Sequence, residues 1–106
     1  MEYISTRGNI APVSAATAIK SGMVPGGGLF IPKNFPMFPA TWQELQTMDY
    51  QALANLVFKL YLTDFAPQAV DQMVQETYNQ QHFSHPKTAP LVALPDGLNI
   101  LELWHG

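Results

Sequence analysis

Arg7 is the residue of this sequence best suited to bind an anion, because a guanidinium can donate two parallel hydrogen bonds to a carboxylate or a phosphate. It directly follows Ser5 and Thr6, and it is the only arginine in the chain. His105 follows an apolar segment and could either face a substrate or pack as an ordinary ring. The pattern alone favours an exposed arginine at a strand end, and His105 alone does not decide between its two roles.

Three consecutive glycines, Gly26 to Gly28, could suggest a loop that binds phosphate. A nucleotide-binding loop of this kind follows a strand, ends in Gly-Lys-Ser/Thr and opens a helix. Here a predicted helix precedes the glycines, a predicted strand follows them, and no lysine stands in the loop. Pro25 before the glycines favours a type II turn instead.

The remaining polar residues do not form a catalytic or metal-binding motif. His82 and His85 lie three residues apart without a cysteine or carboxylate within four residues, whereas a zinc site needs three or four ligands. The chain contains no Gly-x-Ser-x-Gly elbow and no carboxylate pair typical of glycosidases. We therefore expect no metal site and no complete catalytic site in these residues.

Composition restricts the class of protein. A formal net charge of −3 with five scattered basic residues argues against a nucleic-acid partner. No apolar run is long enough to span a bilayer, no signal peptide is recognisable and there is no cysteine, so a cytoplasmic protein without a membrane partner is expected. Charged residues make up only 12% of the chain, against about 25% in an ordinary domain. Either part of the surface faces protein, or the domain is simply rich in neutral polar residues.

These residues must be positioned by one domain of mixed structure over residues 1–106. We expect strands at 3–6 and 29–31, separated by a helix at 15–20 that Ser14 caps and that ends before Gly22. Thr41 and Glu44 form a capping box that starts a short helix. Longer helices follow from Asp49 and from Pro67, because apolar residues recur there on one helical face.

The last part of the sequence predicts a β-hairpin. Apolar segments at 90–94 and 99–104 flank Pro95, Asp96 and Gly97, in which proline presets the turn and glycine takes positive φ. The fold class is therefore α+β, with three to four helices and a small, mainly antiparallel β-sheet.

Read in order, three segments resemble the amino-terminal domain of threonine synthase. Tyr-Ile-Ser-Thr-Arg-Gly at 3–8 resembles the opening strand of that family, and residues 18–32 are similar to its helix, glycine turn and Leu-aromatic-aliphatic-Pro strand. Leu-Glu-Leu-Trp-His-Gly at 101–106 is similar to the family's Leu-Glu-Leu-Phe-His-Gly, which stands just before the segment with the cofactor lysine. Trp104 in place of Phe, Gly26 in place of Asp and Ala15 in place of Phe are departures that repacking could absorb.

The resemblance implies an accessory N-terminal domain of a fold-type II enzyme that uses pyridoxal phosphate to convert O-phosphohomoserine and water to threonine and phosphate. The cofactor lysine of the family would lie beyond residue 106, so the catalytic domain of the same chain is the expected partner. We expect no catalytic and no cofactor-binding residue within these 106 residues, and no activity from them alone. Thr6, Arg7 and His105 are the substrate-facing candidates.

Other functions remain open from the residues. The main alternative is a non-enzymatic protein-interaction module with an apolar binding face. A small metal-dependent enzyme that uses His82, His85 and His105 is a further one, as is a dimer formed through the uncovered face.

Overall fold

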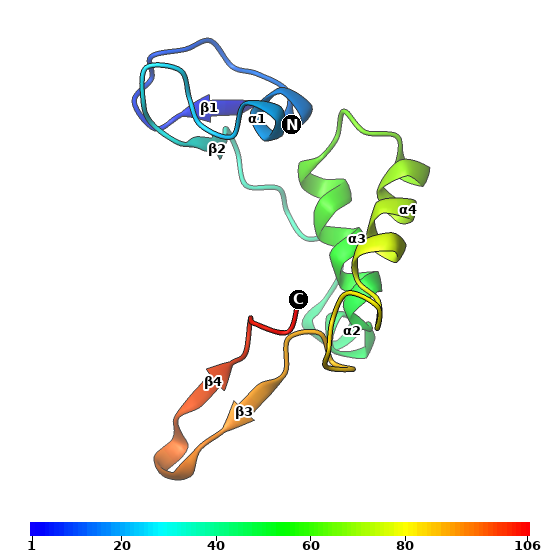
Figure 1. The fold of residues 1–106 in the computed structure, drawn as a ribbon. Helices are drawn as coiled ribbons and strands as arrows, with labels where there is room; N and C mark the ends of the chain where they lie inside the picture. Colours follow the sequence, from blue (N-terminus) through cyan, green and yellow to red (C-terminus); the bar gives the residue numbers. More distant parts are fainter.

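The computed structural model describes residues 1–106 and arranges them in three parts along the chain (Figure 1). Two strands and a helix form an N-terminal lobe, three helices form a middle part, and a β-hairpin forms the last part. In chain order the elements are β1 (Tyr3–Ser5), α1 (Ala15–Ser21), β2 (Phe30–Pro32), α2 (Trp42–Thr47), α3 (Tyr50–Tyr61), α4 (Pro67–Thr77), β3 (Leu91–Ala93), the 3₁₀ turn η1 (Pro95–Gly97) and β4 (Asn99–Leu101).

The α+β class with four helices and antiparallel strands is confirmed. The strands are divided between two separate two-stranded sheets, β1 with β2 and β3 with β4, where the sequence predicted one small sheet. In the first sheet Ile4 pairs with Ile31, and Tyr3 also exchanges two backbone bonds of 2.9 Å with Val13.

The helices begin where the local sequence predicted. The Ser14 side chain accepts from the Thr17 amide at 3.2 Å, and the Thr41–Glu44 capping box is complete. Asp49 caps α3, and Pro67 is the first residue of α4. At the starts of α1, α2 and α3 a side-chain oxygen accepts from an amide group that the helix leaves without a partner, whereas α4 has no such bond and begins at a proline, which has no amide proton.

The glycine segment forms the predicted turn. The Gly27 amide donates to the Val24 carbonyl at 2.9 Å, and Gly26 has φ +80°, the value that a type II turn requires at its third residue. The hairpin turn differs from the prediction, because Asp96 as well as Gly97 has positive φ, +72° and +77°. Aspartate tolerates this region better than most residues.

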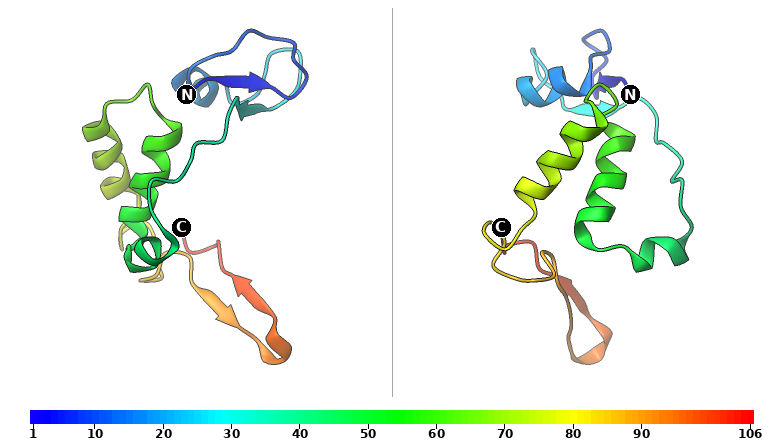
Figure 2. Two further views of the ribbon diagram at one scale, coloured as in Figure 1. Left: turned by 180° about the vertical axis from the view of Figure 1, so that it is seen from behind. Right: turned by 90° about the vertical axis from the view of Figure 1, so that its right-hand side faces the viewer.

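Strand β4 is shorter than the predicted segment 99–104. The Glu102 amide still donates to the Pro90 carbonyl at 3.0 Å, but the chain then leaves the ladder, and the His105 carbonyl accepts from the Ser84 amide at 2.8 Å. The last residues are therefore directed back toward the middle part, where Figures 1 and 2 show the C-terminus.

The core is small and divided. Ala15, Ala18 and Val24 are buried in the N-terminal lobe, and Val70 and Val74 of α4 are buried in the middle part. The radius of gyration is 16.5 Å, whereas a compact domain of this length has about 13 Å. The fold thus leaves most of its apolar side chains accessible.

The N-terminal lobe contacts the middle part at the end of α3. The Tyr3 hydroxyl donates to the Tyr61 carbonyl at 3.1 Å, and the Asp64 carboxylate accepts from the Ala16 amide at 2.9 Å at the start of α1. Residues 33–41 connect the two parts as an extended segment, which descends at a distance from α3 and leads into α2 (Figure 2). None of the helices is long and apolar enough to cross a membrane.

Candidate functional site

The candidate site is the place where the end of β1 meets the glycine turn. Antiparallel pairing brings Thr6 opposite Leu29: the Thr6 amide donates to the Leu29 carbonyl at 3.0 Å, and the Thr6 hydroxyl accepts from the Leu29 amide at 3.0 Å. The turn lies so close that a Cβ on Gly28 would be 2.9 Å from Ser5 Oγ. Glycine is therefore required at position 28 by space as well as by its φ of +107°.

Asn9 fastens the turn to the strand end. Its amide nitrogen donates to the Pro25 and Gly27 carbonyls at 3.3 and 3.2 Å, and its amide oxygen accepts from the Ser5 hydroxyl at 2.6 Å. Ser5 is buried and also accepts from the Arg7 amide at 3.0 Å. These bonds hold the backbone that carries Thr6 and Arg7 in a defined position.

The Arg7 side chain lies over the glycine turn, so that a Cβ on Gly27 would be 2.6 Å from its Nη1. Arg7 is exposed and belongs to none of the three ion pairs in the structure. Its guanidinium is thus positioned without a carboxylate partner, which is the arrangement expected of a group that receives an anion.

His105 lies in a different polar cluster. Its Nε2 is 2.7 Å from a Glu102 carboxylate oxygen, and its Nδ1 is 3.3 Å from the Ser84 hydroxyl. The Ser84 hydroxyl also lies 3.3 Å from the His105 carbonyl oxygen, to which it can donate. The half-buried ring also packs on His85, with centroids 5.1 Å apart. The sequence could not reveal this cluster, because Ser84 and His105 are 21 residues apart.

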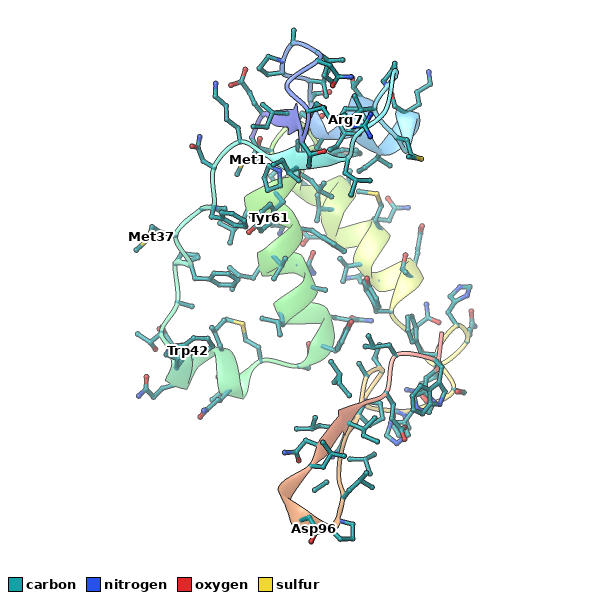
Figure 3. The ribbon with its side chains drawn as sticks, turned by 90° about the vertical axis from the view of Figure 1, so that its left-hand side faces the viewer. Met1, Arg7, Met37, Trp42, Tyr61 and Asp96 are labelled. Atoms are coloured by element: carbon teal, nitrogen blue, oxygen red, sulfur yellow. The ribbon has the colours of Figure 1, made fainter.

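The structure therefore does not bring the three candidates together. Arg7, with Thr6 beside it, belongs to the N-terminal lobe (Figure 3), whereas the C-terminus, next to His105, lies beside the lower end of the middle part (Figure 1). Arg7 and His105 therefore do not form one substrate site within these residues.

No group of three His, Cys, Asp or Glu side chains lies close enough to hold a metal ion. His82 is exposed in its loop, as expected, but His85 is partly covered. The His85 Nδ1 accepts from the Lys87 amide at 3.1 Å.

The four lysines do not fit a cofactor held as a Schiff base. All are exposed; Lys33 pairs with Glu2 at 2.7 Å and Lys59 with Asp71 at 2.6 Å. A lysine with that role needs a sheltered site that lowers the stability of its charged form.

An apolar hollow of about 460 Å³ lies between the extended segment and the helices. Its walls are seven hydrophobic residues: Met37, Phe38, Ala40, Trp42, Leu45, Leu53 and Val57. Met37 and Trp42 are 89% and 79% exposed, and Figure 3 shows the Met37 side chain projecting away from the helices. The low charge content predicted an apolar face, but it did not say where that face lies.

Comparison with known proteins shows the family of this chain. Residues 2–78 match the family model described as the threonine synthase N terminus. The chain belongs to the threonine synthase family. Threonine synthase of Schizosaccharomyces pombe is 36% identical over 109 residues, which cover this whole chain and 21% of that protein. Threonine synthase-like 2 of Homo sapiens is 33% identical and covered to 22%.

A solved structure supports the same family. The crystal structure of threonine synthase from Brucella melitensis, described as bound to pyridoxal phosphate (PLP), is 29% identical, with a TM-score of 0.83 over the whole of this chain and 23% of that one. The chain thus spans about a fifth of the length of the curated relatives that it matches.

Proposed function

We propose that this chain is the N-terminal domain of a threonine synthase, the enzyme that converts O-phosphohomoserine and water to threonine and phosphate with pyridoxal phosphate as cofactor. The observation that carries the proposal is the likeness, over the full length of the chain, to a threonine synthase structure that holds this cofactor. The relatives include both threonine synthase and threonine synthase-like 2, so the identity of the substrate, O-phosphohomoserine, is itself part of the proposal.

In this proposal the cofactor is held outside residues 1–106, by the catalytic domain of the same chain. The four lysines support that placement, because all are exposed, two of them are ion-paired, and none offers a sheltered amine. The 106 residues form one domain that is inactive alone, packs on the catalytic domain and helps to enclose its site. We place the protein in the cytoplasm.

Thr6, Arg7 and His105 are proposed to face the substrate. O-phosphohomoserine carries a phosphate and a carboxylate, and the Arg7 guanidinium suits either group. The pairing of His105 Nε2 with Glu102 fixes the direction of the ring, so a substrate would take the place of Ser84 at Nδ1.

Much exposed apolar surface would also suit an interaction module without activity, but family membership favours the enzyme. The test is the absorption spectrum of the full-length protein with pyridoxal phosphate, together with an assay for threonine and phosphate. We expect an aldimine band and turnover in the full-length protein, and neither in residues 1–106. A full-length protein with no band and no turnover would refute the proposal.

A further inference from the structure

The β3–β4 hairpin projects away from the helices, and all six of its strand residues are exposed (Figures 1 and 2). Its two strands pair with one another alone. An isolated two-stranded hairpin is only marginally stable in water, so strands in this position normally pack against a further layer or pair with further strands.

Both faces of the hairpin are apolar apart from Asn99. The register places Leu91 opposite Leu101 on one face, where they are 65% and 53% exposed. Val92 lies opposite Ile100 on the other face, and Leu98 extends that face. A sheet with one face in water normally alternates apolar and polar residues, whereas strands covered on both faces are apolar throughout. This hairpin has the pattern of strands in a sheet that is covered on both faces.

The outer edges of the hairpin are also open. Bonds between Leu94 and Leu98 and between Glu102 and Pro90 assign the hydrogen-bonded pairs to the even-numbered residues. In an antiparallel ladder the intervening residues direct their backbone groups outward. These residues are Leu91 and Ala93 on β3 and Asn99 and Leu101 on β4. Neither strand carries the charged residue, proline or bulge that usually protects an edge strand.

We infer that the hairpin is a strand-pairing interface, which adds its strands to a β-sheet in the remaining part of the full-length protein. The inference rests on the proposed function, because about four-fifths of the matched relatives lies outside the part that this chain covers. The partner sheet has apolar residues on both faces and layers that cover them, as in an α/β domain. The chain would therefore be joined to its catalytic domain by main-chain hydrogen bonds as well as by side-chain packing.

Hydrogen exchange of single amides in the full-length protein tests this inference. We expect the outward amides of at least one strand, Leu91 and Ala93 or Asn99 and Leu101, to exchange at least about 100-fold more slowly than in an unstructured peptide. The Val92 amide is the internal reference, because its hydrogen bond lies within the hairpin.

Exchange of all four outward amides within about threefold of the unstructured rate, with the reference protected, would overturn the inference. Protection that disappears on dilution to a monomer would assign the edge to a second copy of the chain and would also overturn it. The experiment uses protein that already shows the aldimine band, so that failure of the proposed function is detected before exchange is measured.

Discussion

Replacing Gly28 by alanine should loosen the attachment of the glycine turn to β1. The added Cβ would lie 2.9 Å from Ser5 Oγ and 3.2 Å from Thr6 Oγ1, and the backbone would keep a φ of +107° that side chains rarely adopt. Strain of this kind costs about 1–3 kcal/mol, and displacing one or two hydrogen bonds costs about 1 kcal/mol each. We expect the N-terminal lobe to lose about 3–4 kcal/mol of stability.

Hydrogen exchange of the Thr6 amide measures this loss, because that amide donates to the Leu29 carbonyl between the two segments. In the full-length protein it should exchange about 100- to 1,000-fold faster in the Gly28→Ala variant. Gly22→Ala is the matched control: Gly22 also has positive φ, +69°, but a Cβ there would meet nothing within 4 Å. The control should carry only the backbone penalty of its strained conformation, φ +69° and ψ −57°, which is about 1–3 kcal/mol. If both variants accelerated exchange of the Thr6 amide equally, the close approach of Gly28 to β1 would contribute nothing to stability, and the reasoning would be refuted.

Three further predictions concern the core, a helix start and the candidate site. Val74 is fully buried, so Val74→Ala should destabilise α4 by about 2 kcal/mol. Met73→Ala on the same helix, at a residue 38% exposed, should cost less, and exchange of the α4 amides compares the two variants. Bonds from the Thr41 backbone and side chain lower the pKa of Glu44, so the capping box is stabilising above about pH 4.5 and is lost as the pH falls through the lowered value. An NMR titration of Glu44 with a midpoint at or above 4.5 would contradict this. Arg7→Lys in the full-length enzyme should raise KM for O-phosphohomoserine at least about tenfold while the aldimine band is kept, since an ammonium cannot bind an anion in the same bidentate manner. An unchanged KM would remove Arg7 from the substrate site.

The features that the sequence predicted well depend on nearby residues. Ser14 and the Thr41–Glu44 box mark helix starts through hydrogen bonds within four residues, Pro67 marks one through its own fixed φ, and each is found as predicted. The glycine turn was predicted for the same reason, because proline and positive φ define it locally.

The features that were missed depend on distant residues or on segments without periodicity. Met37 lies in a segment that is neither helix nor strand, so no pattern indicated that it would form the wall of an apolar hollow. The contact of Arg7 with Gly27 follows from the pairing of β1 with β2, and the cluster around His105 depends on Ser84. The strands are divided into two sheets because the N-terminal lobe and the hairpin lie apart. Predicting single helices and strands does not show how those elements lie relative to one another.

The thin core has a consequence for the synthesis of the protein. If this chain is the N-terminal domain of a longer enzyme, as proposed, its residues leave the ribosome first, and only eight of the 106 are buried by the rest of the segment. In a chain as long as the Schizosaccharomyces pombe relative, about 400 further residues must follow, which takes about 20–80 seconds at ordinary rates of translation. During that time the open edges of the hairpin and the exposed side chains around Trp42 have no partner. The nascent chain should therefore be a substrate for chaperones that bind apolar segments at the ribosome.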